Sequence, residues 1–287
     1  MSTPARSSTP LVVGTLALYL VLVLIYNSAT PIFEASDEFR HYLTIRYIAL
    51  HHQLPVLQPS DDPFAPWQEA GQPPLYYLLG TALTGWIDTG DIVQNTDFNP
   101  HAQAGIPSTS PDSKNLFVHS AAEDFPYHGV SLAAHLVRLL SALMGAATVY
   151  LTYRLGRAIA PGLTAVALLA AGLVAFNPQF LFVSASVDND NLITLASTAA
   201  LLLLAQIVVS GLTQRRLWLL SGTLGAAVLA KLSGLGLAPL AAVVVGAQGL
   251  KLSGWRGAIR LVLALASIPV AVSAWWFVRN QLIYGEP

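Results

Sequence analysis

The sequence predicts an all-α protein: a polytopic transmembrane helical bundle with a large first extracytoplasmic loop that contains juxtamembrane helices. Of its 287 residues, 54% are hydrophobic and only 10% are charged, whereas soluble domains carry about 25% charged residues. Several apolar stretches also reach the roughly 20 residues that a spanning helix needs. The 14 Lys and Arg residues against 15 Asp and Glu residues leave no basic excess of the kind that nucleic-acid binders carry. The absence of cysteine excludes disulfides, thiolate metal sites and a cysteine nucleophile.

Residues 1–30 are predicted to form a cytoplasmic start and the first transmembrane helix. The stretch 11–29 contains no charge and follows a short polar segment whose one cation is Arg6. A cleaved signal peptide is the alternative, with Ser28-Ala29 as a weak cleavage site. We favour an uncleaved anchor, because the apolar run is long for a signal peptide and further spans follow.

Residues 31–131 are predicted to form the large outer loop. Within it, residues 73–86 are apolar but too short to span a bilayer. Proline suits the first turn of a helix, so this segment predicts a helix lying in the membrane interface. Its aromatic residues are expected at headgroup level: Tyr76, Tyr77 and Trp86. The polar stretch 88–124 is typical of a mobile lid or insert.

Residues 132–287 are predicted to contain transmembrane helices two to seven and to end in an outer segment. The stretch 217–248 is too long for one upright helix at about 1.5 Å per residue, so we interpret it as two short helices that turn near residues 231–234. The remaining spans are 132–153, 163–183, 192–212 and 258–278.

Charge sign supports this topology. Lys and Arg concentrate in cytoplasmic loops, so we expect a multi-pass protein of the plasma (inner) membrane with a cytoplasmic N-terminus. All 15 acidic residues then lie outside. More than half of the cations lie inside: Arg6, Arg154, Arg157, Arg215, Arg216, Lys251, Arg256 and Arg260. Treating 217–248 as one span would place the last three outside, which disfavours it.

The first candidate site follows the first span. Asp37 and Glu38 are adjacent, with Arg40 and His41 close behind. Neighbouring carboxylates split their pKa values, so one of them can be poised as a base. The alternative is a solvated helix start in which Ser36 is the cap and the acids favour the helix dipole.

Two further segments carry polar groups that can bind ligands. Glu69 and Gln72 lie just before the interfacial helix, where a helix N-terminus can face an anion; an ordinary amphipathic entry turn is the alternative. Asp188 and Asp190, flanked by amides, offer oxygen ligands for Mg²⁺ or Mn²⁺. Capping of the next helix is the alternative there, and both interpretations are compatible.

Three cations lie at the expected outer depth of the membrane: Arg138, Lys231 and Arg279. Charge inside a span is costly and indicates function, and a phosphate group suits such cations. The alternative is that their side chains snorkel to the interface. The seven histidines show no metal-ligand spacing.

Taken together, these segments resemble the GT-C superfamily of membrane glycosyltransferases. They are most similar to bacterial relatives of protein O-mannosyltransferases and lipid A aminoarabinose transferases. The resemblance rests on the Asp37-Glu38 pair after the first span and on four longer segments: PPLYY (73–77), 138–157, FNPQFLFVSASVDNDNL (176–192) and WWFVRNQLIYGEP (275–287).

The resemblance implies a polyprenyl-phosphate-linked sugar donor, an outward-facing site, inversion at the anomeric carbon and Asp37 as the catalytic acid of the pair. It also implies metal binding by Asp188 or Asp190, although metal use varies across the superfamily. Gln72 stands where aminoarabinose transferases carry a cation, so substrate detail does not transfer. Relatives run to roughly twice this length, so the chain is expected to be an N-terminal portion, a truncated form or one half of a split enzyme.

The leading functional hypothesis is therefore sugar transfer at the outer face, with the lipid bilayer, the lipid-linked donor and an acceptor (protein, lipid or glycan) as partners. Glu38, Glu69, Asp188 and Asp190 would line the cleft, and Arg138 or Lys231 would hold the leaving phosphate. The alternatives are a membrane transporter, which would bury ionisable groups at mid-membrane, and a non-catalytic fragment that binds lipid or a partner.

Overall fold

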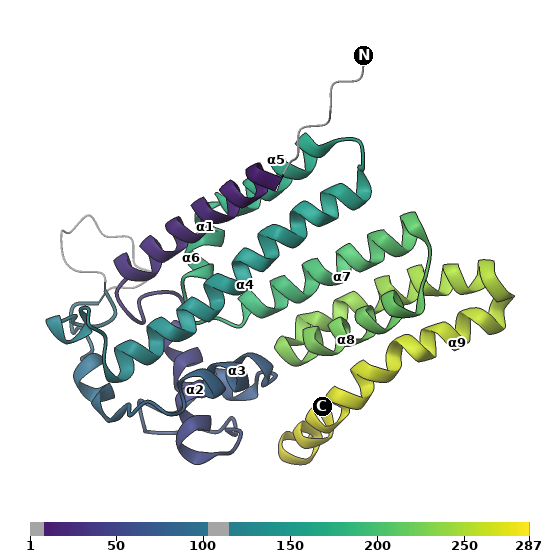
Figure 1. The fold of residues 1–287 in the computed structure, drawn as a ribbon. Coiled ribbons are helices and arrows are strands. Elements are labelled where there is room, and N and C mark those ends of the chain that lie inside the picture. The colour runs from purple at the N-terminus through teal and green to yellow at the C-terminus, as the bar shows by residue number, and fades with distance from the viewer. Residues whose placement is uncertain (1–8, 103–114, 287) are drawn as a thin grey trace.

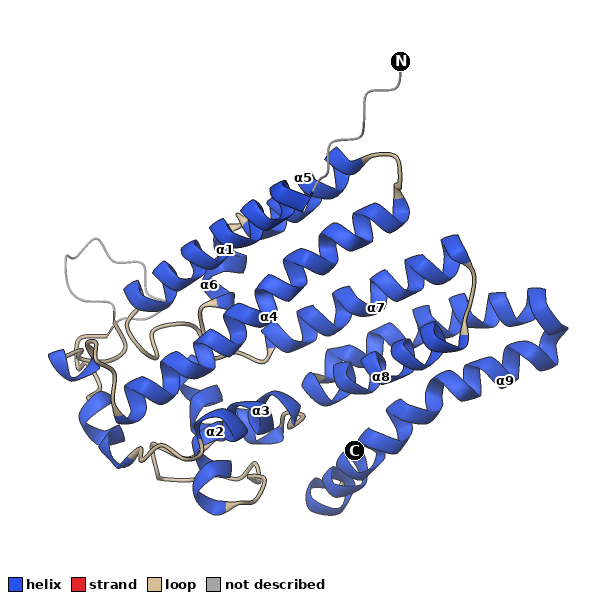
Figure 2. Ribbon diagram, viewed as in Figure 1, coloured by secondary structure: helices blue, strands red, loops and turns tan. Residues whose placement is uncertain are grey.

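The computed structural model describes residues 9–102 and 115–286, and its helices pack side by side (Figures 1 and 2). Apart from one isolated bridge between Phe98 and Phe117, these residues form no β-structure. The all-α prediction is confirmed. Arg6 and part of the predicted lid, residues 103–114, lie outside the described residues.

The long helices run between two ends of the bundle (Figure 1). They are α1 (Thr9–Ala29), α4 (Gly129–Ile159), α7 (Asp190–Ser210), α8 (Gln214–Ala230) and α9 (Leu237–Tyr284). Four helical stretches within the described residues are long and apolar enough to cross a membrane: α1, α4, α7 and Leu232–Tyr284, which includes α9. The bent pair Thr164–Ala175 and Pro178–Ser184 is a fifth if it counts as one span. Many of their leucine and valine side chains are exposed, as expected where lipid replaces water around the helices.

The predicted span 163–183 is a bent pair of helices. α5 (Thr164–Ala175) and α6 (Pro178–Ser184) meet at an angle of 62°. The side chain of Asn177 accepts hydrogen bonds from the N–H groups of Gln179 and Phe180, and Pro178 occupies the first turn, so a new helix start is built into the sequence at this point.

The stretch 217–248 forms two helices, as predicted. Lys231 ends α8 in an extended conformation, and a short 3₁₀ helix, η4 (Leu232–Gly236), leads into α9. Gly234 packs directly on the backbone of Ala227, where a Cβ atom would collide. This close approach keeps Lys231 at the tip of the turn.

A second break divides α9. Ser253 and Gly254 have non-helical torsions, and Gly254 (φ 67°, ψ −163°) is in a region open essentially only to glycine. The two halves of the helix fold back against each other (Figure 1). Lys251 and Arg256 therefore lie at the same turn.

The segment between α1 and α4 forms a helical cap over one end of the bundle. Its elements are α2 (Glu38–His51), η1 (Gln68–Gly71), α3 (Leu75–Thr84), η2 (Gly90–Asn95) and η3 (Ala121–Glu123). α3 lies within the predicted interfacial segment. Phe33, Phe39 and Phe117 are buried together in the core that joins this cap to α4 and α7. The Glu34 carboxylate accepts hydrogen bonds from the N–H groups of Leu116 and Phe117 and fastens the end of the loop.

Because successive long helices run in opposite directions, the segments that connect them lie at two opposite ends of the bundle. The cap, the α6–α7 junction, η4 and the end of α9 lie at one end, whereas the α4–α5, α7–α8 and mid-α9 turns lie at the other (Figure 1). The candidate residues of four separate segments are thereby brought to one end of the molecule.

Candidate active site

The adjacent acids Asp37 and Glu38 have opposite environments. Asp37 is exposed and has a left-handed backbone (φ 58°) at the N-cap position of α2, and its side chain makes no capping hydrogen bond. A non-glycine residue in this region is uncommon, and such strain clusters at functional sites. Glu38 is fully buried. The alternative of a solvated helix start still describes Asp37, although the N-cap residue is Asp37 and not Ser36. It does not describe Glu38, which is buried.

Glu38 forms a buried bidentate ion pair with Arg138 of α4. Arg138 Nε donates to Oε1 and Nη2 to Oε2, both at 2.7 Å, and both side chains are 0% exposed. The Glu38 carboxylate also accepts hydrogen bonds from the N–H groups of Phe33 and Val187 at 2.9 Å. One carboxylate thus ties the start of α2 to α4 and to the α6–α7 junction.

All five N–H groups of Arg138 donate hydrogen bonds within the protein. Besides the two bonds to Glu38, it donates to the carbonyl oxygens of Asn27, Thr30 and Pro31. A guanidinium has five donors, so none remains to bind a phosphate. In this arrangement Arg138 holds the end of α1 and the carboxylate of Glu38.

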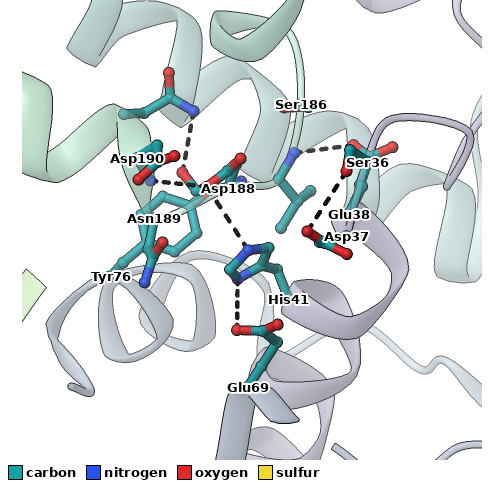
Figure 3. A network of polar contacts seen from close by, with 12 residues as sticks. Ser36, Asp37, Glu38, His41, Glu69, Tyr76, Ser186, Asp188, Asn189 and Asp190 are labelled. Atoms are coloured by element: carbon teal, nitrogen blue, oxygen red, sulfur yellow. Dashed lines mark hydrogen bonds and ion pairs between the residues drawn. The ribbon is translucent and has the colours of Figure 1, made fainter. Parts of the chain in front are cut away.

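His41 lies at the centre of a polar cluster (Figure 3). Its Nδ1 is 2.9 Å from the Tyr77 hydroxyl and 3.9 Å from the Glu69 carboxylate, and its Nε2 is 3.7 Å from Asp188 Oδ1. Asp37 and Lys231 also act electrostatically on His41. The ring is 4% exposed, and burial lowers its pKa, with the nearby carboxylates opposing that shift.

Asp188 and Asp190 face different partners. The N–H of Asp188 donates to the Tyr76 hydroxyl at 3.0 Å, and Asp188 Oδ1 accepts the N–H of Asp190 at 2.8 Å. The Asp190 carboxylate forms an ion pair with Lys231 from η4. Burial is the main cause that raises the pKa of Asp188 to about 6, because a carboxylate in a low-dielectric site favours its neutral form.

Gln72 bridges two parts of the cluster. Its Nε2 donates to Glu69 Oε2 at 2.7 Å, and its Oε1 accepts from Asn189 Nδ2 at 2.8 Å. Asn189 also donates to the Ala230 carbonyl oxygen, next to Lys231, at 3.3 Å. These amides fix the positions of Glu69 and Lys231 relative to each other.

The donor set of this cluster does not fit a divalent cation. Within the described residues no group of three or more His, Asp or Glu side chains is arranged to hold a metal ion. Asp188 Oδ1 is engaged by a backbone N–H, and Asp190 by an ammonium group. The Asp188 carboxylate instead accepts the N–H of Asp190, the first residue of α7, which supports the capping interpretation for Asp188. The N-cap residue Asn189 makes no side-chain capping bond.

Arg279 contacts a different part of the loop. Its Nη2 donates to the Pro55 carbonyl oxygen at 2.6 Å, and its guanidinium lies 5.1 Å from the centre of the Trp276 ring. Arg279 thus connects the end of α9 to the cap through Leu54 and Pro55, which lie outside the cluster around His41.

Tyr76 and Tyr77 lie in a different environment from the one that the sequence predicts. Tyr76 and Tyr77 were expected at headgroup level, but both are at most 1% exposed. The Tyr76 hydroxyl shares a hydrogen bond with Ser141 of α4 at 2.8 Å, and Tyr77 contacts His41. Burial raises the pKa of both phenols. Trp86 is 72% exposed, and its place at headgroup level stays a prediction.

An apolar cavity of about 530 Å³ lies between α8, η4 and both halves of α9. Gly234 and Leu235 of η4 form part of its wall, three and four residues after Lys231. Its lining is almost entirely aliphatic. The cavity and the polar cluster therefore share the η4 turn as a boundary.

The comparison with known families agrees with this architecture. Residues 111–284 match the family described as dolichyl-phosphate-mannose-protein mannosyltransferase, PMT. The matched range includes α4 to α9 with Asp188, Asp190 and Lys231, and Asp37 and Glu38 precede it. No curated protein shows significant similarity to the chain.

Proposed function

Because the chain belongs to the dolichyl-phosphate-mannose-protein mannosyltransferase family, whose members are membrane glycosyltransferases, we propose that it moves a sugar from a polyprenyl-phosphate donor to a hydroxyl acceptor at the outer face of the membrane. Asp37 is the base, and the reaction inverts the anomeric carbon. The observation that carries the proposal is the convergence of Asp37, His41, Glu69, Asp188 and Lys231 from four segments at one end of the bundle.

The reaction is a single displacement. The acceptor oxygen forms a bond to the anomeric carbon while the bond from that carbon to the phosphate oxygen breaks, and attack from the opposite face inverts the centre. The acceptor proton passes to the Asp37 carboxylate, and the electron pair of the broken bond stays on the phosphate. Asp37 suits this role because it is the exposed acid of the pair, so its carboxylate can accept a proton from an incoming hydroxyl.

Lys231 is the cation that we assign to the leaving phosphate. It is 31% exposed and its partner Asp190 is 47% exposed, so the pair can open to an anion at little cost. The aliphatic cavity bounded by η4 is suited to the prenyl chain. Charge on the phosphate grows as its bond to the sugar breaks, so an ammonium there stabilises the transition state more than the ground state.

Glu38 and Arg138 position the site. Their buried pair connects α2, which carries His41, to the backbone of Val187 next to Asp188. We assign them no contact with substrate, because all donors of Arg138 and both oxygens of Glu38 are engaged within the protein.

Asp37→Asn tests the assignment. Asparagine tolerates the left-handed backbone of this position, so the variant removes the base without disturbing the turn. We expect loss of sugar transfer from a polyprenyl-phosphate donor, with membrane insertion and melting temperature (Tm) unchanged. Asp61→Asn, an exposed acid of the same loop, is the matched control and should keep full turnover. Wild-type turnover by Asp37→Asn would refute the role of Asp37, and retention of configuration in the product would refute single displacement.

A further inference from the structure

Four arginines surround two adjoining cavities at the end of the bundle opposite the candidate active site. The cavities, of about 380 and 350 Å³, lie between the ends of α4, α7 and α8 and share Arg154, Gln206 and Arg216. Arg215 lines one and Arg157 lines the other. No acidic residue is among the described residues that line them. We call these four arginines and their two cavities the arginine pocket.

The positive charge of the arginine pocket is not neutralised. None of the four arginines takes part in the ion pairs found among the described residues. Three of them are held by neutral oxygens: Arg154 by the Tyr150 hydroxyl, Arg157 by the Tyr153 hydroxyl, and Arg216 by the carbonyl oxygens of Ser210 and Gly211. These contacts orient the guanidinium groups and leave their charge available.

Only part of the Arg157 guanidinium can face the cavities. Arg157 Nε is shielded from solvent and makes no hydrogen bond within the described residues. Because Nε is shielded, an anion in the cavities would be bound by the terminal nitrogens of this guanidinium and not by Nε. The N-terminus of α8, capped by Thr213, lies in the same wall and adds a partial positive charge.

We propose that the arginine pocket binds the phosphodiester headgroup of an anionic phospholipid. Arginine suits phosphate because its fork of donors matches two phosphate oxygens, and basic pockets between transmembrane helices are a known setting for such headgroups. The pocket also includes Leu219 and Val209, which are 50% and 56% exposed. An occupant that contacts both arginine and exposed aliphatic side chains is amphiphilic.

Orientation of the helices by charge is the competing explanation for these arginines. That effect requires only that cations lie near one membrane surface. It does not require two arginines of α4 and two of α8 to line common cavities that contain no acidic residue. The geometry therefore points to a bound anion and not only to a charge bias.

The test is a lipid titration of the purified full chain in neutral detergent. Phosphatidylglycerol, phosphatidylcholine and inorganic phosphate are added separately, and bound lipid is followed by native mass spectrometry together with Tm. We expect tight, salt-sensitive binding of phosphatidylglycerol alone. The double variant Arg154→Gln/Arg157→Gln should weaken it about 25-fold, or about fivefold per arginine. Arg256→Gln/Arg260→Gln, a matched pair in α9 that lines neither cavity, should leave binding within about twofold.

Three results would overturn the proposal. One is equal binding of phosphatidylglycerol and phosphatidylcholine by the wild type. Another is an equal loss in the pocket variant and in the α9 control. The third is stabilisation by inorganic phosphate as large as that by the lipid, which would make the site one for a free anion. Should the pocket variant fail to fold, the three-ligand comparison on the wild type decides the question alone.

Discussion

Glu38→Gln is expected to destabilise the protein strongly although it changes only one atom of the side chain. The carboxylate accepts four hydrogen bonds, two at each oxygen. In glutamine one of these oxygens becomes an NH₂ donor, so in either amide orientation two N–H groups face another donor. The charge of Arg138 is then buried without a counterion.

The magnitude follows from the burial of the pair. Both side chains are 0% exposed, so water does not screen the lost interaction, and breaking such a pair costs about 3–5 kcal/mol. At about 2–4 °C per kcal/mol for a large domain, Tm should fall by about 6–20 °C. Thermal unfolding in lipid nanodiscs, followed by tryptophan fluorescence, measures this shift.

Two controls separate the buried charge from other effects. Glu38→Gln/Arg138→Met removes both charges and should recover part of the lost stability, because it removes the unpaired guanidinium. Recovery should be incomplete, because the carbonyl oxygens of Asn27, Thr30 and Pro31 lose their donor. Asp37→Asn, one residue away, should leave Tm unchanged. A loss below about 1 kcal/mol for Glu38→Gln, the range of an exposed ion pair, would refute the role that we assign to the pair.

Two further predictions concern Asp188 and the break in α9. The pKa of Asp188 is raised from 3.8 to about 6, so its stabilising contribution is complete below about pH 4 and is lost as pH rises through about 6. Asp188→Asn mimics the neutral form of the side chain. In chemical denaturation the variant should be more stable than the wild type by an amount that grows between pH 4 and 6 to roughly 3 kcal/mol. A stability difference that does not depend on pH would contradict this. Gly254→Ala should cost about 1–3 kcal/mol from backbone strain alone, because open space surrounds its Cβ position. Gly222→Ala, in open space within α8, should instead stabilise by up to about 1 kcal/mol, and equal unfolding free energies for the two alanine variants would count against the strain argument.

The helical architecture was predictable because its signals are local. Apolar length predicts spanning helices, and the interruption around Lys231 predicts the α8–α9 turn because a cation and glycines end a helix within a few residues. The bend between α5 and α6 was missed, although Asn177-Pro178 is a local start signal. It lies inside an apolar run, where hydropathy outweighs capping in the prediction of a span.

The candidate site was predictable in the residue types that gather there, but the environment of each residue was not. Asp37 and Glu38 are equivalent neighbours in the sequence, yet one is exposed and the other is buried against Arg138, which is 100 residues away along the chain. Arg138 was expected to bind phosphate because a charge within a span indicates function. Its partners include backbone carbonyl oxygens at the end of α1, and no residue type encodes such partners.

The sequence by itself determined the apolar stretches and the end of the bundle at which the acidic residues gather, since charge sign and apolar length act locally and do not depend on how the helices pack. Only the tertiary structure decided which of these charges meet. Helix packing buries Tyr76 and Tyr77 beside His41 and Asp188, pairs Lys231 with Asp190, and gathers Arg154 and Arg216 around common cavities. Burial and pairing depend on contacts between distant segments, and those contacts set both the pKa of a carboxylate and the donors that an arginine has left to offer.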